Sequence, residues 1–593
     1  MKKIPTLGLA MITKNEEKYL SKCLDSVIDI IDEIVIVDSG STDKTLDIAK
    51  RYNAHTYYKE WENDFSKARN YALSKATTDW VLLLDADEEV DKQYKLKILD
   101  LIESEEYDGY YSKIYNYYGS SINDGYVIHT AFRLLRNNKK YFFRGSIHEQ
   151  ITPCSEEHKG IFNMSDIIIH HYGYLDENIT IKKKRERNIP LLEKELQLSP
   201  NNPFYMYSLA NEYAALKEND LAIELYEKAR LELNTTHGFA SSLYYKLITV
   251  LYNNKNYNIA RLRVNEANIL FPKCVDFHYL NGLINRQMYN YTIAMDSLNK
   301  CIELGDTPMK FMDGCGTYLP YIVLGDIFQE INDYTRAINS YNNAVIINRR
   351  NYQLLYTICD LLLKKYKNSI KVIENIKSYF SDLEDNTNKV LYLDILLSNN
   401  ILDELYEDIS CIENNKNIGN EDYYILAKYN FKNKNYDKAL GYLNSILLDE
   451  AIITEKFLTN YKLMYLTSLL ILQKDLNIIP NNIRVLFNDI VLKFFNTNTN
   501  IINASNNNID ISMEAYDFII SIYDILLEEK ETSIFNKYIV LLDYIQNERK
   551  YLDMAKVLYR NNFKSQALIY IKESISKFDN IDKECSRILL LES

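Results

Sequence analysis

A pattern of small and large apolar residues recurs about every 34 residues from residue 204 onward, and it strongly limits how this part can fold. Two good copies share one order of small and aromatic residues: Ala222, Tyr226 and Ala229, then Ala337, Tyr341 and Ala344. Small residues let two helices cross closely, while large residues fill the space between successive helix pairs. The sequence therefore predicts an all-α solenoid of helix pairs over residues 204–593.

Further copies support the repeat. They contain Leu247, Leu251, Ala260, Ala267 and Pro272; Gly282, Ala294 and Leu298; Leu426, Ala427, Ala439 and Leu443; and Ala555, Ala567 and Ile571. This is the spacing of a tetratricopeptide helix pair. The Asn-rich stretch 496–510 has few apolar anchors and is interpreted as a loop inside the array, or as a bias of composition alone.

Residues 1–180 follow a different pattern, in which short apolar runs alternate with helical segments. The runs are LGLAMI (7–12), EIVIVD (33–38), HTYYKE (55–60) and WVLLLD (80–85). Continuous apolar strands separated by helices predict a parallel sheet covered on both faces. Later runs are expected to form a second half-sheet: GYYSKIYNYYG, HTAFRLLR, KYFFRG and DIIIHH. We therefore expect an α/β domain over 1–180, a helical linker over 181–203, and the repeat array after it.

Charge and hydropathy exclude several classes of protein. The chain has 69 Lys and Arg against 82 Asp and Glu, a net charge of −13, which disfavours binding to nucleic acid. No apolar run approaches the ~18–20 residues that span a bilayer. The opening MKKIPTLGLAMI is followed by TKNEE, so it is interpreted as a first strand and not as a signal peptide. Eight cysteines without a Cys-x-x-Cys pair suggest reduced thiols. We expect a cytoplasmic protein without a transmembrane segment.

Two carboxylates directly follow the fourth apolar run. Asp85 and Asp87 are separated by Ala86, and Glu88 and Glu89 come next. Carboxylates two residues apart at a strand end can point into one cleft and hold a divalent cation. An acidic helix start is the alternative reading, since Asp and Glu favour first turns.

The second apolar run ends in a turn, at Asp38-Ser39-Gly40-Ser41-Thr42-Asp43. Gly40 suits a tight turn, and Ser41, Thr42 or Asp43 can cap the helix that follows. Ligands of parallel α/β sheets bind beyond the carboxyl ends of the strands. Asp38 therefore stands where it could accept a hydrogen bond from the ring N–H of a ligand, although it could instead be one more turn cap.

Four motifs in order resemble those of the family 2 glycosyltransferases with a GT-A fold: TLGLAMITKNEEKYLSKCLDSV, VDSGSTDKT, NDFSKARNYAL and WVLLLDADEEV. The resemblance covers about the first 175 residues. Asp38-Ser39 stands where the family commonly has two Asp residues, so only the first carboxylate is carried over. The resemblance implies a GT-A (Rossmann-like) domain that uses a nucleotide-activated sugar, expected to be a UDP-sugar.

The resemblance also implies a nucleotide-sugar site made of Thr13, Asn15, Glu16, Asp38, Arg69, Asp85 and Ala86. The first three would lie beside the nucleoside, and Asp38 would read the uracil. Arg69 would approach the nucleotide, although a helix-surface arginine is an equal reading. Asp85 and Asp87 would hold Mn²⁺ or Mg²⁺ against the diphosphate, and the metal would stabilise charge on the departing UDP.

The segment Arg144-Gly145-Ser146-Ile147-His148-Glu149 lies at the end of the KYFFRG run. By the resemblance, a glycine followed shortly by a carboxylate occupies the region where inverting enzymes of this fold keep their general base. Glu149 is therefore interpreted as the base that takes the proton of the acceptor hydroxyl, with His148 as its neighbour or as an acceptor-site residue. The alternative is a His–Glu pair that braces the strand.

His171 ends the DIIIHH run and begins His171-Tyr172-Gly173-Tyr174. Many GT-A domains end in a histidine that completes the metal shell, so the resemblance assigns His171 as a third ligand, and imidazole beside carboxylates suits Mn²⁺. A structural histidine is the alternative. The basic run 182–187 could neutralise a diphosphate, or it could form a solvated helix face.

The His-Glu and His-Tyr-Gly-Tyr motifs and the following helical segment resemble a narrower bacterial group. In that group a GT-A domain is fused to tetratricopeptide repeats, and known members modify flagellin at Ser or Thr or a bacteriocin at Cys. We therefore predict a metal-dependent inverting glycosyltransferase. It moves a hexose or N-acetylhexosamine from a UDP-sugar to Ser or Thr of a protein acceptor, with flagellin favoured.

Three alternatives stay open at this stage. The acceptor could be a peptide cysteine or a cell-surface glycan instead. The long concave surface of a solenoid suits a polypeptide, but the repeats could equally serve homodimerisation. The third alternative is a protein of a different class, a repeat scaffold without catalytic activity. The Asp-x-Asp pair and Glu149 argue against it.

Overall fold

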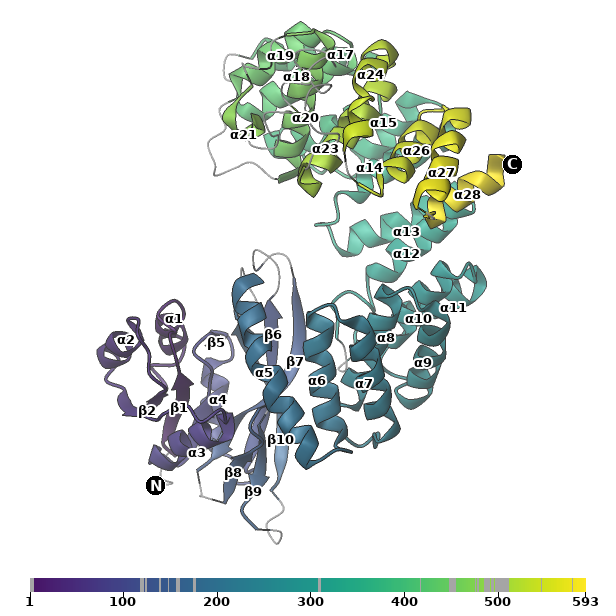
Figure 1. Cartoon of the computed structure of the whole chain (residues 1–593). Coiled ribbons are helices and arrows are strands. Elements are labelled where there is room, and N and C mark those ends of the chain that lie inside the picture. The colour runs from purple at the N-terminus through teal and green to yellow at the C-terminus, as the bar shows by residue number, and fades with distance from the viewer. Residues whose placement is uncertain are drawn as a thin grey trace. The chain divides into compact units, whose positions relative to one another are not determined.

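The computed structural model describes residues 5–592 except 118–121, 123–124, 138–139, 148, 156–159, 174–177, 308–310, 416–417, 447–454, 475, 477–478, 485–490, 492–494, 496–510, 546 and 579. The chain forms two compact units, Met1–Asn351 and Tyr352–Ser593. The first contains a mixed sheet followed by helices, and the second is helical (Figure 1). The predicted fold class is confirmed, while the boundaries at 180 and 203 stay predictions.

Four parallel strands form the N-terminal half of the main sheet: β1 (Leu7–Thr13), β2 (Glu33–Asp38), β3 (His55–Tyr58) and β4 (Trp80–Leu83). The helices between and after them are α1 (Leu20–Asp25), α2 (Thr45–Arg51), α3 (Phe65–Lys75) and α4 (Lys95–Ile102). Asp64 caps α3 by accepting from the backbone N–H of Lys67 at 3.0 Å. The predicted α/β alternation is therefore present.

Alternate residues of these strands enter two separate hydrophobic clusters. Leu9 and Met11 belong to a cluster that includes residues of α1 and α4, whereas Ala10 belongs to a cluster with residues of α3. Successive side chains of a strand point to opposite faces of a sheet. β1, β2 and β4 are almost wholly buried because both faces of the sheet are covered there, whereas the edge strand β3 is mostly exposed.

The second half of the sheet is mixed. Its strands are β5 (Glu88–Val90), β6 (Gly109–Tyr117), β7 (Tyr126–Arg136) and β10 (Phe162–His171). The strand order is β3-β2-β1-β4-β7-β6-β10-β5, in which β7 runs antiparallel to both β4 and β6. The short edge strand β5, which directly follows Asp87, was not predicted. Because it pairs with β10, it brings Glu88 opposite His171.

The KYFFRG run does not join the second half-sheet as predicted. It forms β8 (Tyr141–Arg144), which pairs with β9 (Gln150–Pro153) in a separate two-stranded sheet. Asn70 of α3 fixes its position, because its side chain donates to the carbonyl of Phe143 at 2.8 Å and accepts from the N–H of Phe143 at 2.7 Å. The loop between β8 and β9 is therefore held beside α3.

The rest of the first unit is helical, with the bounds α5 (Asn178–Leu198), α6 (Pro203–Ala215), α7 (Asn219–Leu231), α8 (Ala240–Asn253), α9 (Tyr257–Leu270), α10 (Val275–Gln287), α11 (Tyr291–Leu304), α12 (Leu319–Glu330) and α13 (Tyr334–Ile347). Most of the segment 181–203 lies in α5, which ends at Leu198, and its last residue, Pro203, begins α6. Asn202 caps α6 by accepting from the N–H of Phe204 at 2.9 Å, and Pro203 occupies the first helical position.

The small residues of the repeat lie where helices cross. Several alanines of the pattern are fully buried: Ala210, Ala222, Ala229, Ala260, Ala267, Ala294, Ala337 and Ala344. A Cβ on Gly325 would lie 2.5 Å from the ring of Tyr341, and one on Gly282 would lie 2.8 Å from Leu298. The predicted tetratricopeptide-type pairing is confirmed, because only small side chains fit at these crossings.

The second unit continues the helical pattern, with the bounds α14 (Leu354–Tyr366), α15 (Ser369–Lys377), α16 (Asn386–Ser398), the 3₁₀ helix η1 (Asp403–Leu405), α17 (Tyr406–Glu413), α18 (Asn420–Lys432), α19 (Tyr436–Ser445), α20 (Glu455–Ile471), α21 (Asn481–Arg484), α23 (Met513–Glu528), α24 (Thr532–Tyr538), α25 (Leu541–Tyr544), α26 (Lys550–Arg560), α27 (Lys564–Phe578) and α28 (Lys583–Glu592). Ala439, Ala555 and Ala567 are fully buried, as the repeat requires. The Asn-rich stretch 496–510 lies outside the described residues. Of the helices in the described ranges, none is both long and apolar enough to cross a membrane.

Candidate active site

The carboxyl ends of β1 and β2 meet at one edge of the sheet. Thr13 and Asp38 are register partners in these parallel strands, and both are buried. The hydroxyl of Thr13 lies 3.4 Å from Asp38 Oδ1. The structure therefore brings together two of the residues predicted to bind the nucleoside.

Asp38 also organises its own turn. Its Oδ2 accepts from the N–H groups of Gly40 at 2.8 Å and Ser41 at 2.9 Å, and its Oδ1 accepts from the Ser41 hydroxyl at 2.5 Å. Gly40 has a φ of +92°, which an L side chain rarely adopts. The turn-cap role, which the sequence left open for Asp38, is therefore present in the structure.

The loop after β1 is tied to this turn. The N–H of Asn15 donates to Ser41 Oγ at 2.9 Å, and Asn15 Oδ1 accepts from the N–H of Thr42 at 2.8 Å. The N–H of Glu16 donates to Thr45 Oγ1 at 2.7 Å. The predicted nucleoside residues thus form one hydrogen-bonded group of two loops.

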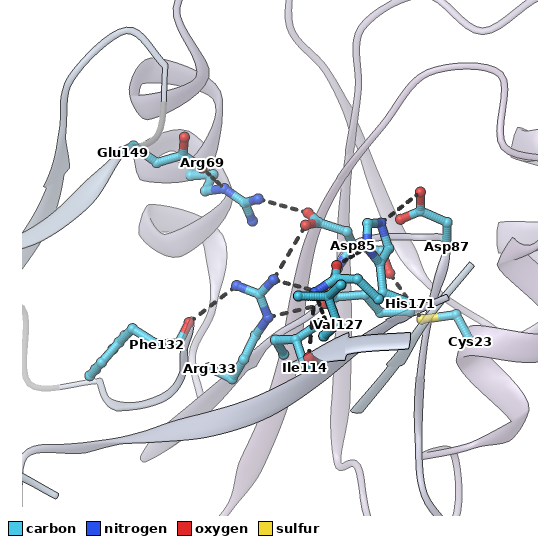
Figure 2. A network of polar contacts seen from close by, with 12 residues as sticks. Cys23, Arg69, Asp85, Asp87, Ile114, Val127, Phe132, Arg133, Glu149 and His171 are labelled. Carbon is cyan, nitrogen blue, oxygen red and sulfur yellow. Dashed lines mark hydrogen bonds and ion pairs between the residues drawn. The ribbon is translucent and has the colours of Figure 1, made fainter. Parts of the chain in front are cut away.

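Asp85 lies just beyond β4 and faces two arginines (Figure 2). Its Oδ1 lies 2.7 Å from Arg69 Nη2, and its Oδ2 lies 3.5 Å from Arg133 Nη2. Burial opposes ionisation, but the two guanidiniums outweigh it and hold the pKa of Asp85 well below its usual range. Asp85 is therefore a carboxylate at any physiological pH.

Glu88 shares Arg133 with Asp85. Arg133 donates from Nη2 to Glu88 Oε1 at 2.6 Å and from Nε to Oε2 at 3.1 Å, while Oε2 also accepts from the N–H of Asp85 at 3.1 Å. Burial raises the pKa of Glu88, although Arg133 opposes this shift. This planar two-point pairing fixes the loop that contains Asp85.

Asp87 pairs with His171. Their Oδ2 and Nε2 atoms lie 3.3 Å apart, and His171 Nδ1 lies 2.7 Å from Asn116 Oδ1. Burial lowers the pKa of His171, but Asp87 and the neighbouring carboxylates raise it more, so that the net shift is upward. A Cβ on Gly173 would lie 2.2 Å from Asp87 Oδ2 and 2.7 Å from His171 Nε2, so Gly173 leaves room for this pair.

The donor set of Asp85, Asp87 and His171 suits Mn²⁺, which accepts carboxylate oxygen and imidazole nitrogen. Asn116 holds the second nitrogen of His171 and so directs Nε2 toward Asp87, as an outer partner of a metal-bound histidine does. In the part of the chain that the structure describes, no group of three or more His, Cys, Asp or Glu side chains is arranged so that it could hold a metal ion. The residues fit a divalent cation chemically, with Asp85 turned to its arginines.

Arg69 connects Asp85 to Glu149, the predicted base. Its Nη2 contacts Asp85 and its Nε donates to Glu149 Oε1, with only 11% of the Arg69 side chain exposed (Figure 2). The reading of Arg69 as a helix-surface arginine is therefore wrong. Burial alone would lower the pKa of Arg69, and the two carboxylates raise it, so it stays a cation.

The other predicted residues are placed as follows. Ala86 is buried in the hydrophobic cluster on the α1 side of the sheet. His148 lies outside the described residues. From the basic run, Arg185 Nη1 pairs with Glu212 of α6 at 2.5 Å, and the guanidinium of Arg187 lies 4.9 Å from the ring centre of Phe65. Arg185 and Arg187 thus contact neighbouring helices, and neither is part of the Asp85–Asp87 site.

Sequence reasoning missed Arg133 and Asn116. Arg133 lies inside the run HTAFRLLR, which a second arginine, Arg136, ends, and Asn116 is the last residue but one of a tyrosine-rich strand. A single charged residue at an inward position of an apolar strand is a usable signal, because an unpaired buried charge is costly. Its partner could not be identified, because the β4–β7 register brings distant residues together.

Comparisons with known proteins agree with this architecture. The family described as "Glycosyl transferase family 2" matches residues 9–163. The chain is 32% identical over 308 residues to the SPbeta prophage-derived glycosyltransferase SunS of Bacillus subtilis (strain 168), which covers 51% of this chain and 70% of that protein. An α/β transferase domain joined to tetratricopeptide-type repeats is the class that the fold and site define. The chain belongs to the family 2 glycosyltransferases and is a glycosyltransferase.

Two further likenesses were found. A TPR repeat-containing protein of Synechococcus elongatus (strain ATCC 33912 / PCC 7942 / FACHB-805) is 30% identical over 222 residues, which cover 36% of this chain and 53% of that protein. The crystal structure of MamA is 21% identical and covers 30% of this chain and 99% of that chain, with a TM-score of 0.25. At that TM-score the likeness to MamA carries no argument.

Proposed function

We propose that this glycosyltransferase moves a hexose or N-acetylhexosamine from a UDP-sugar to Ser or Thr of a protein acceptor, with inversion and with a divalent metal. One observation carries the proposal. Arg69 contacts Asp85, on the proposed donor side, and Glu149, on the proposed acceptor side. A cation between these carboxylates fits a reaction in which a diphosphate leaves from one side and a hydroxyl attacks from the other.

The nucleoside would lie on the joined loops after β1 and β2. Thr13, Asn15, Glu16 and Asp38 gather there, at the edge where ligands of parallel sheets bind. Asp38 would accept from the uracil ring. Its existing donors, in the turn, hold the carboxylate in one orientation for this role.

Asp85, Asp87 and His171 would hold Mn²⁺ or Mg²⁺. When bound, the cation would supply Lewis-acid stabilisation of negative charge on the leaving UDP. Arg69 and Arg133 both contact Asp85, so their side chains would have to shift when the cation binds to that carboxylate. Asn116 would keep His171 oriented through its Nδ1 atom.

Glu149 would act as the general base. As the acceptor hydroxyl oxygen forms a bond to the anomeric carbon, its proton passes to a carboxylate oxygen of Glu149. The bond between that carbon and the diphosphate oxygen breaks, and its electron pair leaves with UDP. One direct displacement inverts the anomeric centre. Arg69 orients the carboxylate through Oε1.

A polypeptide acceptor is supported by the repeat array, since solenoids present an extended concave surface. The similarity to glycosyltransferase SunS extends over 308 residues, about twice the length of the family match at 9–163, and so includes residues beyond that match. Flagellin is the first acceptor to test. A homodimer through the repeats is the alternative use of the array.

The test incubates the full chain with UDP-glucose or UDP-N-acetylglucosamine, Mn²⁺, and either flagellin or peptides that carry Ser, Thr or Cys. Intact mass spectrometry should detect a hexose or N-acetylhexosamine on a hydroxyl-bearing acceptor. EDTA should abolish the transfer, and Mn²⁺ or Mg²⁺ should restore it. If only the Cys peptide is modified, the acceptor residue is cysteine and not Ser or Thr. If activity in EDTA is complete, the reaction does not depend on a metal.

A further inference from the structure

Residues 145–147 and 149, between β8 and β9, include the proposed base and are held from two sides. Gly145 has a φ of +103°, so the chain turns sharply as it leaves β8. Ser146, Ile147 and Glu149 lie outside both strands. The position of Glu149 therefore depends on what the neighbouring residues contact.

One side of the loop is held by α3, the helix that contains Arg69. The carbonyl of Ser146 accepts from the N–H of Phe65, the first residue of α3, at 2.8 Å. Asn70 of the same helix makes two hydrogen bonds to the backbone of Phe143. The two partners of the Arg69–Glu149 ion pair are thereby joined through the backbone as well.

The other side of the loop is held by the first helices of the array. The N–H of Ser146 donates to Glu195 Oε1 of α5 at 3.1 Å. The hydroxyl of Tyr205, on α6, donates to the same Glu195 carboxylate. Tyr205 Oη also lies 3.4 Å from the point where a Cβ on Gly145 would stand.

Apolar packing reinforces these polar contacts. Ile147 is 3% exposed and belongs to one hydrophobic cluster with residues of α5 and α6, namely Leu191, Leu192 and Leu209. Phe65, Ile189 and Tyr205 pack against the same cluster. The loop that contains the proposed base is thus built into the start of the helical array.

We propose that Glu195 and Tyr205 are positioning residues for catalysis, which set the place of Glu149 through the backbone of Ser146. The inference rests on the proposed role of Glu149 as base. It assigns to α5 and α6 a part in the chemical step, in addition to any part that the array has in binding the acceptor. Neither residue touches the reacting atoms.

The expected effect is on turnover and not on donor binding. Glu195→Ala removes the acceptor of the Ser146 N–H, so the loop can shift, and a displacement of about 1 Å can cost about 100-fold in rate. We expect kcat for UDP-sugar hydrolysis and for transfer to fall about tenfold or more. KM for the UDP-sugar and Kd for UDP should stay within about twofold, because the nucleoside residues lie on other loops.

Conservative variants separate positioning from general loss of structure. Glu195→Gln keeps an oxygen acceptor for Ser146 and should restore most of kcat. Tyr205→Phe keeps the ring and removes only the hydroxyl, so it should lower kcat less than Glu195→Ala does. The double variant should fall short of additive loss, because the two residues act through one carboxylate.

Glu193→Ala is the matched control. Glu193 lies on the same helix two residues away, is exposed, and pairs with the hydroxyl of Tyr213 at 3.2 Å. Its loss should leave kcat unchanged. Thermal melting of each variant, with and without UDP, should show that all of them fold.

Three outcomes would overturn the inference. Wild-type kcat in Glu195→Ala is one, failure of Glu195→Gln to restore a lost kcat is another, and an equal loss in Glu193→Ala is the third. Failure of the underlying mechanism has a different signature. If Glu149→Gln transfers sugar at the wild-type rate, Glu149 is not the base, whatever Glu195→Ala does.

Discussion

Arg69 is the residue on which the site depends most, because it contacts both carboxylates that the proposed reaction uses. Because Arg69 is mostly buried, both of its ion pairs are stronger than exposed ones, since water screens a buried ion pair less. Arg133 supports the same network from β7 through Asp85 and Glu88. The two arginines thus contact three acidic side chains, those of Asp85, Glu88 and Glu149.

Glu149→Gln tests the base. The amide keeps the size of the side chain but cannot take a proton, so transfer should fall by the ~10²–10⁴-fold that a general base contributes. UDP binding with Mn²⁺, measured by titration calorimetry, should persist. Exposed Gln150→Ala, the next residue, is the control and should transfer normally. Loss of UDP binding in Glu149→Gln would make Glu149 a structural residue or a ligand.

Gly173→Ala tests the Asp87–His171 pair. The added methyl group would lie 2.2 Å from Asp87 Oδ2, so the pair must move apart. Outer-shell changes commonly cost 10–100-fold in metal affinity, and we expect a Mn²⁺ loss of about that size, measured by electron paramagnetic resonance. Gly238→Ala is the matched control, since no atom lies within 4 Å of its Cβ position. Equal Mn²⁺ affinity in both variants would contradict the assignment.

Among the elements, α10 contains a buried acid that makes stability depend on pH. Asp276 is 1% exposed and accepts from the backbone N–H groups of Phe311 at 3.1 Å and Met312 at 2.9 Å. Burial raises the pKa of Asp276 to about 6, against the opposing effect of these hydrogen bonds. The carboxyl group therefore joins α10 to the segment after α11 at an electrostatic cost near neutral pH.

The pH dependence follows from the raised pKa. The folded protein holds the proton of Asp276 more tightly than the unfolded chain does, so this stabilisation is full below about pH 4 and is lost as the pH rises through about 6. Asp276→Asn keeps an acceptor oxygen and removes the charge. At pH 8 it should raise the free energy of unfolding by up to about 3 kcal/mol and the apparent Tm with it, and both should change little at pH 4.

Differential scanning fluorimetry at both values of pH measures this effect. Asp296→Asn, on the exposed face of the neighbouring α11, changes the net charge equally and should leave the Tm unchanged. A gain in Tm at pH 8 that Asp296→Asn matched would come from net charge and not from burial. No gain at pH 8 would mean that Asp276 is stabilised as a carboxylate.

The arrangement of strands and helices also determines which parts of the site and fold could be predicted from the sequence. Thr13, Asp38 and Asp85 could be grouped because the carboxyl ends of neighbouring parallel strands share one edge, and the alanines of the repeat could be assigned because only small residues fit a helix crossing. The residues that contact Asp85 could not be predicted from the sequence. Arg133 reaches it through an antiparallel strand whose register depends on tertiary packing, and β5 is too short to show a pattern.

At the scale of the whole molecule, the compact unit Met1–Asn351 includes both the site and the first helix pairs. We expect a fragment of residues 1–351 to fold, to bind UDP and to hydrolyse UDP-sugar slowly. A fragment that ends at residue 200 lacks α6 and therefore exposes Ile147 and Leu192, which pack on Leu209. It should aggregate or lose hydrolysis.

Gel filtration, thermal melting and a UDP-release assay compare the two fragments with the full chain. If the 1–351 fragment hydrolyses UDP-sugar but transfers poorly to flagellin or peptide, the later repeats contribute to acceptor binding. If the fragment transfers sugar as well as the full chain does, the later repeats do not contribute to acceptor binding. A stable and active 1–200 fragment would show that the site does not need α6.

The packing of α5 and α6 against the loop 145–149 also decides where one array could be exchanged for another. A recombination junction placed before α5, where the sheet ends, would separate Ile147 from its partners and pair it with foreign helices. A junction after α7 would carry those partners along with the sheet. In chimaeras with related enzymes, we therefore expect the sheet and its first helices to work only when they are exchanged together.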